Sequence, residues 1–216
     1  MFNVCPNCGE YRVDKIIVPE GPYAVCPVCE YRYKFMRLPL FVLTGASGVG
    51  KTTTCLELAA RTKNFVVMES DILWRDEFNQ PETNYLNYRE TWLRVCKNIS
   101  QADKPVILCG AGIPDQFEQC VERRYFSDIH YLALVCEDEA LAARLGSRPD
   151  WRGVSDEYIE RHVEFNRWLK ANAQSTQPPM SVIDTSAITV SETAGRVEQW
   201  ASAQVLVEEL QRTRPG

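Results

Sequence analysis

The chain has 216 residues, of which 45% are hydrophobic and 25% are charged, as in an ordinary globular protein. Its length fits one α/β domain with a small appended module. A formal net charge of −5 disfavours binding to nucleic acid, because neutralising phosphates requires a basic surface. No apolar run of about 18 residues predicts a membrane span, and the N-terminus lacks the apolar core of a signal peptide. We therefore expect a cytoplasmic protein that does not enter the membrane.

Two pairs of cysteines, each in a CPxC sequence, lie near the N-terminus: Cys5 with Cys8, and Cys26 with Cys29. The 17 residues between the pairs (9–25) fall within the range typical of zinc sites. Each pair directs two thiolates at one centre, and two pairs complete a tetrahedral sulfur shell with no open position for a substrate. The pattern predicts a structural Zn²⁺ site; a redox pair or free thiols is the alternative reading.

Residues 1–37 are therefore predicted to form a zinc ribbon, with short strands expected within 11–18 and 19–25 on either side of a Pro-Gly-Pro turn. So short a segment cannot bury a core of its own, so a metal would supply much of its folding free energy. Such a module could also bind a protein partner. The remaining cysteines lie in apolar patterns and are expected to be core residues: Cys55, Cys96, Cys109, Cys120 and Cys136.

An apolar strand is predicted at 38–44, and it leads into GASGVGKT at 45–52, which matches the phosphate-binding pattern G-x-x-x-x-G-K-[ST]. The glycines let backbone N–H groups face one anion, and the helix that follows adds a favourable dipole. We expect Lys51 to reach the β- and γ-phosphates of ATP and the Thr52 hydroxyl to hold Mg²⁺. The predicted nucleotide-binding residues are Gly45, Ala46, Ser47, Gly48, Val49, Gly50, Lys51, Thr52 and Thr53.

Four further apolar strands alternate with helices along the rest of the chain. The strands are expected at 64–68, 105–109, 129–136 and 181–184, and the helices at 83–101, 137–145, 155–173 and 191–211, with Ser155 and Ser191 as N-caps of the last two. This alternation predicts a parallel sheet covered on both faces. The fold class is therefore α/β: a P-loop NTPase domain over 38–216, with three α/β/α layers and a five-stranded parallel sheet.

Polar residues follow each predicted strand, at the sheet edge where ligands of such folds bind. They are Glu69-Ser70-Asp71 after the second strand, Gly110-Ala111-Gly112 after the third, the stretch from Arg144 to Arg152 after the fourth, and Asp184-Thr185-Ser186 after the fifth. Together with the phosphate-binding loop, the sequences ESD, CGAGI, RLGSRPDWR and IDTS resemble the P-loop small-molecule and nucleotide kinases, especially the shikimate and gluconate kinase-like group. The resemblance spans about residues 38–210.

The resemblance implies roles for several of these residues. Asp71 would contact the acceptor hydroxyl and act as its base, and Glu69 would lie near the Mg²⁺. The glycine loop implicates Gly110 and Gly112 in seating the substrate. Arg148 and Arg152, in a mobile lid at about 146–155, would cover the transferred phosphate. Arg144, just before the lid, would contact ATP. The stretch from Asp184 to Ser186 would lie near the adenine.

Each assignment has a plainer alternative. Asp71 could cap the following turn, Glu69 could be solvated surface, the glycines could serve a tight turn, and each lid arginine could be a surface cation. Tyr85, Tyr88 and Trp92 share one helix face and are core residues more often than a substrate cage. The two histidines, His130 and His162, are expected to serve packing or to lie on the surface.

The function predicted is an ATP- and Mg²⁺-dependent transfer of a phosphoryl group to a hydroxyl or phosphate of a small molecule, nucleoside or nucleotide. The alternative is a regulatory P-loop ATPase whose ribbon docks a protein or nucleic acid. The sequence LALVCEDE at 132–139 superficially resembles the acidic motif of such ATPases, but its acidic residues continue into a helix that carries Arg144. A guanine-specific N-K-x-D signature is absent from the sequence.

Overall fold

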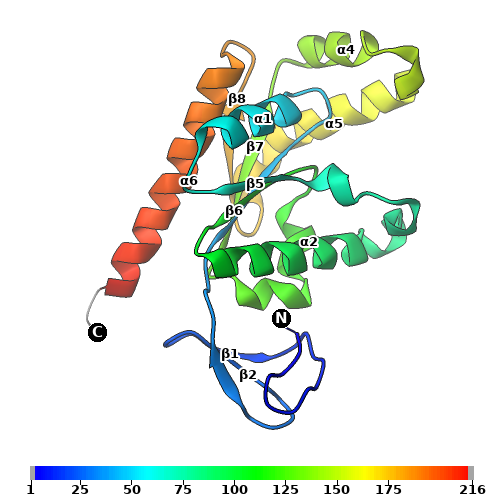
Figure 1. Cartoon of the computed structure of the whole chain (residues 1–216). Helices are drawn as coiled ribbons and strands as arrows, with labels where there is room; N and C mark the ends of the chain where they lie inside the picture. The colour runs from blue at the N-terminus through cyan, green and yellow to red at the C-terminus, as the bar shows by residue number, and fades with distance from the viewer. Residues whose placement is uncertain (1–2, 214–216) are drawn as a thin grey trace.

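The computed structural model describes residues 3–213, so residues 1–2 of the predicted ribbon and 214–216 of the predicted domain lie outside the described part. Its larger sheet has five parallel strands in the order β5-β6-β4-β7-β8 (Figure 1). Their bounds are Leu40–Gly45 (β4), Val66–Glu69 (β5), Val106–Cys109 (β6), Ile129–Val135 (β7) and Met180–Asp184 (β8). The predicted five-stranded parallel sheet is therefore confirmed.

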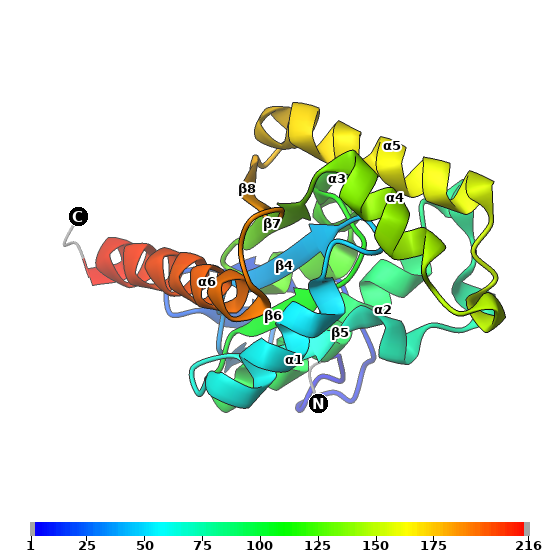
Figure 2. The same ribbon diagram turned by 90° about the horizontal axis from the view of Figure 1, so that it is seen from above.

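Helices cover both faces of this sheet, as Figure 2 shows from above. They are α1 (Lys51–Arg61), α2 (Leu86–Ile99), α3 (Pro114–Glu118), α4 (Asp138–Gly146), α5 (Asp156–Asn172) and α6 (Val190–Thr213). Side chains of β4 alternate between the two layers: Leu40 and Val42 pack with the core residues of α2 and α3, whereas Phe41 and Leu43 pack with those of α1, α4 and α6. Within residues 3–213, no helix is both long enough and apolar enough to cross a membrane.

The strand order places one opening at the carboxyl end of β4. The chain passes from β4 through α1 to β5, returns to β6 beside β4, and then crosses to β7 on the other side of β4. Connections that leave a parallel strand in opposite directions create a crevice at its carboxyl end. The fold therefore predicts a ligand site directly after Gly45, where the glycine-rich loop begins.

The segment between β5 and α2 differs from the prediction. It contains three short 3₁₀ turns, Ser70–Leu73, Asp76–Phe78 and Pro81–Thr83, and α2 begins only at Leu86 instead of about residue 83. The helix starts late because Asn84 and Tyr85 both have left-handed backbones, with φ of 54° and 59°. Tyr85 therefore lies just before α2 and Tyr88 lies within it, although the two residues have helical spacing in the sequence.

The ends of two later helices test the predicted caps. The Ser155 hydroxyl accepts the N–H of Tyr158 at 3.2 Å, which confirms Ser155 as the N-cap of α5. The prediction for Ser191 is wrong, because α6 begins at Val190 and Thr189 supplies the cap. The Thr189 hydroxyl accepts the N–H of Glu192 at 3.2 Å, and the Glu192 carboxylate accepts the N–H of Thr189 at 2.8 Å. The short helix α3, which opens on a proline, was not predicted.

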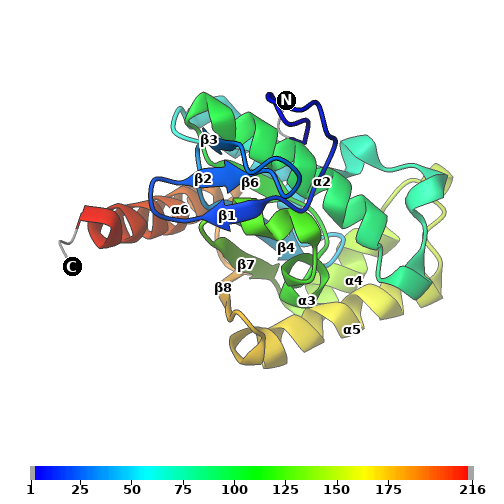
Figure 3. The same ribbon diagram turned by 90° about the horizontal axis from the view of Figure 1, so that it is seen from below.

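The N-terminal segment forms a small antiparallel sheet of three strands, β1 (Ile16–Val18), β2 (Tyr23–Val25) and β3 (Arg32–Lys34). Two of these strands were expected; β3 was not. Viewed from below, the small sheet lies against α2 (Figure 3), and Gln101, just after that helix, exchanges hydrogen bonds of 2.9 and 3.0 Å with the backbone of Met36.

Buried polar contacts join this small sheet to the larger domain. The Lys97 ammonium on α2 is buried, forms an ion pair with the buried Glu122 carboxylate and donates to Oδ1 of Asn3 at 2.6 Å. The Tyr125 hydroxyl donates to the carbonyl of Val13 at 2.6 Å. A charge pair removed from water is costly to break, because either partner left alone remains desolvated. The N-terminal segment is therefore packed firmly on α2 and on the turn that carries Glu122 and Tyr125.

Candidate active site

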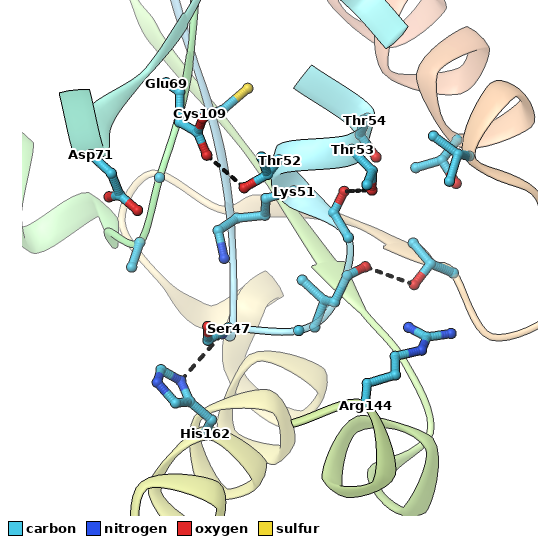
Figure 4. A pocket seen from close by; sticks show the side chains of 18 of the residues that line it. Ser47, Lys51, Thr52, Thr53, Thr54, Glu69, Asp71, Cys109, Arg144 and His162 are labelled. Atoms are coloured by element: carbon cyan, nitrogen blue, oxygen red, sulfur yellow. Dashed lines mark hydrogen bonds between the residues drawn. The ribbon is translucent and has the colours of Figure 1, made fainter. Parts of the chain in front are cut away.

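The loop at 45–52 joins β4 to α1 and curls around the start of that helix. Gly50, the residue before α1, has φ 102°, a left-handed conformation that favours glycine. The Lys51 ammonium folds back and donates to the carbonyls of Gly45 at 2.7 Å and Ala46 at 2.9 Å (Figure 4). Burial lowers the pKa of Lys51 to about 8, with Asp71 opposing the shift. This lysine is a largely desolvated cation whose hydrogen-bond partners in the loop are neutral.

The acidic residues after β5 face this loop. Glu69 is the last residue of β5, and its Oε1 accepts a hydrogen bond from the Thr52 hydroxyl at 2.5 Å. Asp71 lies two residues further on, and its exposed carboxylate is on the Lys51 side of the loop in Figure 4. A hydroxyl and carboxylates that converge at a phosphate-binding loop form the all-oxygen donor set that Mg²⁺ prefers. Thr52, Glu69 and Asp71 therefore fit a magnesium ion.

The acidic turn is fixed by aromatic residues of α2. The carbonyl of Ser70 accepts the Tyr88 hydroxyl at 2.6 Å and the Trp92 indole N–H at 3.0 Å. Tyr88 and Trp92 are both buried, which agrees with the expected core role for them. Through Ser70, these two side chains also set the position of the neighbouring carboxylates of Glu69 and Asp71.

The glycine loop after β6 lies against the same turn. A Cβ atom on Gly110 would come within 1.9 Å of the Ser70 hydroxyl oxygen, and one on Gly112 would come within 2.7 Å of the Phe117 ring. The backbone N–H of Gly112 donates to the Thr44 hydroxyl at 3.1 Å. Close packing therefore requires a glycine at both positions, a reason that differs from the tight turn stated as the plainer alternative. It also brings the loop's backbone to the edge of the cavity.

A cavity of about 670 Å³ surrounds the phosphate-binding loop. All three predicted lid arginines line it, Arg144 from α4 and Arg148 and Arg152 from the turn that follows. Arg148 donates to the Ser47 hydroxyl at 3.1 Å, and the Arg152 guanidinium lies 4.8 Å from the centre of the Trp151 ring. These three cations are distant in sequence from residues 45–52, yet they line the same cavity as that loop.

His162 on α5 also reaches the loop, although a packing or surface position was expected for it. Its Nδ1 accepts the backbone N–H of Ser47 at 3.2 Å. Burial, together with the positive charges of Lys51 and Arg161, lowers the pKa of His162 to about 4. The ring is therefore neutral near pH 7, as an accepting nitrogen requires. The spacing of Tyr158 and His162 placed them on one face of α5, but no feature of the sequence indicated that this face meets the loop.

Of the polar segment from Asp184 to Ser186, only one residue reaches the cavity. Thr185 lines the cavity, and its hydroxyl donates to the carbonyls of Val49 at 3.3 Å and Val135 at 3.0 Å. Asp184 and Ser186 bond mainly to each other, since Oδ1 of Asp184 accepts both the N–H and the hydroxyl of Ser186. Neither is among the residues that line the cavity.

The acidic residues of the sequence at 132–139 lie away from the cavity around the phosphate-binding loop. Asp138 accepts hydrogen bonds from Arg167 at 2.5 Å and Lys170 at 3.2 Å, both on α5, and Glu137 precedes the first residue of α4. Neither carboxylate lines the cavity around the loop. The carboxylates that do reach that cavity come from Glu69 and Asp71 at the end of β5.

A second cavity, of about 520 Å³, adjoins the first, and the two share Asp71 and Ala111 in their walls. Most of the residues that line it were not predicted from the sequence. Tyr85 and Tyr88 line it, so the aromatic face of α2 serves both the core and a cavity. Its lining also includes Trp74, Arg89, Gly112 and Gln116.

The four N-terminal cysteines converge on one point. Their sulfur atoms all lie within 4.8 Å of one another, with Cys5 and Cys29 at 3.6 Å and Cys8 and Cys26 at 3.9 Å. Zinc–sulfur bonds of about 2.3 Å in a tetrahedron require sulfur–sulfur separations of about 3.8 Å. All four are free thiols, so the arrangement fits a Zn²⁺ ion bound by four cysteines.

The turns that present these cysteines have matching geometry. The N–H of Gly9 donates to the Cys5 carbonyl at 2.9 Å, and the N–H of Glu30 donates to the Cys26 carbonyl at 2.9 Å. The residues that end the turns, Gly9 and Glu30, both have positive φ, of 75° and 59°. Two turns of the same shape therefore face each other across the sulfur cluster.

The fold and the glycine-rich loop define the larger domain as a P-loop protein. A family model described as "AAA domain" matches residues 42–163, more than half of the chain, and the chain belongs to this family. No curated protein matches the chain.

Solved structures with a similar fold include kinases. A gluconokinase from Sinorhizobium meliloti 1021 has a TM-score of 0.55 and 15% identity, covering 82% of this chain and 99% of that chain. The tunicamycin resistance protein of Deinococcus radiodurans has a TM-score of 0.52 and 17% identity, covering 76% and 96%. A shikimate kinase from Acinetobacter baumannii in complex with shikimate has a TM-score of 0.50 and 18% identity, covering 79% and 96%. At such identities the similarity establishes the fold.

Proposed function

We propose that the protein is an ATP- and Mg²⁺-dependent kinase that transfers the γ-phosphoryl group of ATP to a hydroxyl or phosphate of a small molecule, nucleoside or nucleotide. One observation carries this proposal: the Asp71 carboxylate lies in the wall of two adjoining cavities, one around the phosphate-binding loop and one beyond it. A phosphotransferase needs a donor site and an acceptor site that meet at a group able to address the acceptor.

In this proposal the donor site is the cavity around the loop. Backbone N–H groups of 45–53 hold the phosphates of ATP, Lys51 neutralises their charge, and Arg144 contacts the nucleotide. Thr52 and Glu69, already hydrogen-bonded to each other, would hold Mg²⁺. When bound there, the ion would neutralise charge on the phosphate oxygens.

At the acceptor side, Asp71 orients the hydroxyl and accepts its proton while the hydroxyl oxygen bonds to the γ-phosphorus. The bond from that phosphorus to the β–γ bridging oxygen breaks, and ADP leaves with the electron pair. Arg148 and Arg152 stabilise the charge on the transferred group, and Gly110 and Gly112 seat the acceptor. Such steps depend on positioning and charge neutralisation more than on covalent chemistry.

Residues 146–155 serve as the lid in this mechanism. The contact of Arg148 with the Ser47 hydroxyl supports this role, because it joins the segment to the phosphate-binding loop. Closure over ATP would exclude water, which otherwise competes with the acceptor for the phosphoryl group.

The N-terminal module, residues 1–37, is proposed to be a zinc ribbon with one structural Zn²⁺ bound by Cys5, Cys8, Cys26 and Cys29. Its exposed face is available to a protein partner. The kinase domain then comprises residues 38–216.

Measurement of ADP release in the presence of ATP and Mg²⁺ tests the proposed function. We expect ADP release to rise at least tenfold when a correct acceptor is supplied from a panel of hydroxyl-bearing metabolites, nucleosides and nucleotides, with the phosphorylated product found by mass spectrometry. ADP release that is the same with every member of the panel would contradict a kinase.

A regulatory ATPase is the second candidate, and the match to the AAA domain family favours it. In that case ATP hydrolysis would respond to a macromolecule docked on the ribbon and would yield inorganic phosphate in equal amount to ADP. The kinase yields ADP and phosphorylated acceptor instead, so measurement of free phosphate alongside ADP distinguishes the two functions.

The affinity for ATP is expected to depend on pH through Lys51. The charged ammonium binds phosphate, and burial sets its pKa in the free protein at about 8. Bound phosphates favour the charged form and raise this pKa, so the affinity is complete below pH 8 and falls as the pH rises above it. We expect a decrease of about tenfold per pH unit above 8. Titration of a fluorescent ATP analogue between pH 7 and 10 measures it, and Lys51→Met should bind weakly with no such slope. A wild-type affinity unchanged up to pH 10 would contradict the proposed contact.

A further inference from the structure

Lys15 is a buried lysine at the junction between the small N-terminal sheet and the larger domain. The residue is 0% exposed, and its Nζ atom has no hydrogen-bond partner within residues 3–213. Its main chain is held in place, because the N–H donates to the Tyr125 hydroxyl at 3.4 Å and the carbonyl accepts from Nη1 of Arg124 at 3.3 Å. A desolvated ammonium without a partner is costly, so an opposite charge beside it would be strongly stabilising.

Two carboxylates in this region are already bound to other cations. Asp14, the preceding residue, accepts hydrogen bonds from Arg12 at 2.8 and 2.6 Å. Glu122, in the turn on which the N-terminal segment packs, forms an ion pair with Lys97. In the described part of the chain, neither carboxylate forms an ion pair with Lys15. The charge that balances this ammonium must therefore come from another group.

The strand register places Lys15 opposite one of the four clustered cysteines. β1 pairs with β2 so that Ile16 faces Val25, and one step further along the two chains Lys15 faces Cys26. Side chains alternate along a strand, so Cys26 lies on the same face as Ala24, which belongs to a core cluster shared with the larger domain. Lys15 and Cys26 are both 0% exposed. The lysine and this cysteine therefore share the buried face of the small sheet.

Tyr33 lies close to both the lysine and the sulfur cluster. The Nζ atom of Lys15 is 5.8 Å from the centre of the Tyr33 ring. Burial raises the pKa of Tyr33, with negative charge on Cys5 and Cys26 acting in the same direction. The same side chain is therefore within electrostatic range of the ammonium and of two of the four sulfur atoms.

The two halves of the sulfur cluster differ in exposure. Cys8 is exposed, and the Cys29 sulfur accepts a hydrogen bond from Asn7 at 3.6 Å. Cys5 and Cys26 are buried, with 1% and 0% exposure. Four thiolates around one Zn²⁺ ion give a centre with a net charge of about −2. Water and Asn7 can moderate this charge at the exposed half, whereas the buried half requires a cation from the protein.

We propose that Lys15 is the counter-charge of the zinc centre: its ammonium stabilises the four-thiolate site from the buried side of the small sheet. The cost of burying the ammonium and the cost of burying an anionic metal site then offset each other. This role rests on the zinc ion of the proposed N-terminal module, and it does not depend on the kinase function. Residues around metal ligands commonly change metal affinity by about 10- to 100-fold.

Zinc affinity tests the charge on Lys15. The full chain would be titrated near neutral pH with a chromophoric chelator of known zinc affinity. Lys15→Met keeps an apolar stem and removes the charge, so the apparent dissociation constant for zinc should rise about 10- to 100-fold. Lys34→Met is the matched control, because Lys34 is exposed on β3 of the same small sheet, and it should bind zinc as the wild type does. Equal effects of the two substitutions would overturn the role of Lys15.

Lys15→Arg separates charge from packing. Arginine retains the positive charge in a bulkier side chain, so this variant should keep a zinc affinity close to that of the wild type. A residue that only fills space would give the opposite order, with methionine tolerated and arginine not. That order, or equal losses in both variants, would refute the role of the charge. If Lys15→Met fails to fold, Lys15→Gln, which is neutral and polar, replaces it in each comparison.

Co²⁺ in place of zinc provides a spectroscopic readout of the same charge. Cobalt bound by thiolates has absorption bands in which an electron moves from sulfur to the metal. A cation near the sulfur atoms stabilises the electrons on sulfur, so Lys15→Met should shift these bands to longer wavelength and Lys34→Met should not. Bands at the wild-type wavelength in Lys15→Met would count against the proposal.

The wild-type chain separates this inference from the zinc module on which it rests. A wild type that binds neither zinc nor cobalt would refute the metal site and the role of Lys15 together. One zinc ion per chain, with the same affinity in Lys15→Met, would refute the role of Lys15 alone and leave the module standing.

Discussion

Asp71→Asn is expected to lower the rate of phosphoryl transfer by about 100- to 10,000-fold, the range that general-base catalysis contributes. The amide has nearly the size of the carboxylate but cannot accept the proton of the acceptor hydroxyl. Affinity for ATP should change little at pH 7, since Lys51 keeps its contacts with the Gly45 and Ala46 carbonyls. Steady-state transfer rates and titration with a fluorescent ATP analogue measure the two quantities.

Asp76→Asn is the matched control for this experiment. Asp76 lies in the exposed 3₁₀ turn Asp76–Phe78 and lines neither cavity. Its substitution removes the same charge five residues away and should leave transfer at the wild-type rate. Full activity in Asp71→Asn would eliminate Asp71 as the base, and equal losses in both variants would point to a general effect of charge.

Cys26→Ser is expected to reduce bound zinc from about one ion per chain to almost none. Structural zinc contributes about 10–16 kcal/mol of apparent binding free energy in small zinc-finger peptides. Loss of even about 5 kcal/mol from a chain of this size lowers the Tm by roughly 10–20 °C. Metal analysis by mass spectrometry and thermal unfolding followed by circular dichroism provide the readouts.

The same variant should affect acceptor binding more than ATP binding. The ribbon contacts α2 through Lys97 and Asn3, and α2 carries Tyr88 and Arg89 at the second cavity. We therefore expect the KM for the acceptor to rise while the affinity for ATP changes little. Cys96→Ala, a buried position on α2, is the control and should retain one zinc ion. A folded Cys26→Ser protein with unchanged Tm and zinc content would contradict the ribbon.

Much of the fold was predictable because its signals are local. The apolar strand that runs into GASGVGKT identifies both β4 and the loop that follows, and the spacing of Cys5, Cys8, Cys26 and Cys29 is sufficient to predict a metal cluster. The polar residues Glu69 and Asp71 were placed at the correct end of the sheet, because parallel strands end at one edge. These inferences need only neighbouring residues and the geometry of a parallel sheet.

The features that were not predicted depend on contacts between distant segments. His162 follows a regular helix face, and only the packing of α5 brings it to Ser47, 115 positions away. The burial of Arg89 and Lys97 on α2 was not predicted either, because it depends on Phe117, Glu122 and the N-terminal segment. The late start of α2 depends on the left-handed backbones of Asn84 and Tyr85, and the spacing of hydrophobic residues gives no information about backbone angles.

The junction between the ribbon and α2 has a practical consequence for anyone who assays this protein. A chelator would remove the proposed zinc ion, and a thiol reagent would modify the cysteines that hold it. Either would loosen α2 and impair the site, although the proposed chemistry uses no thiol. Inhibition by EDTA would then have two origins, and adding Mg²⁺ back would reverse only one of them. Sensitivity to N-ethylmaleimide usually indicates a reactive cysteine in an active site. Here it would indicate modification of the N-terminal cysteines, whose segment contacts α2 at the end opposite to the site.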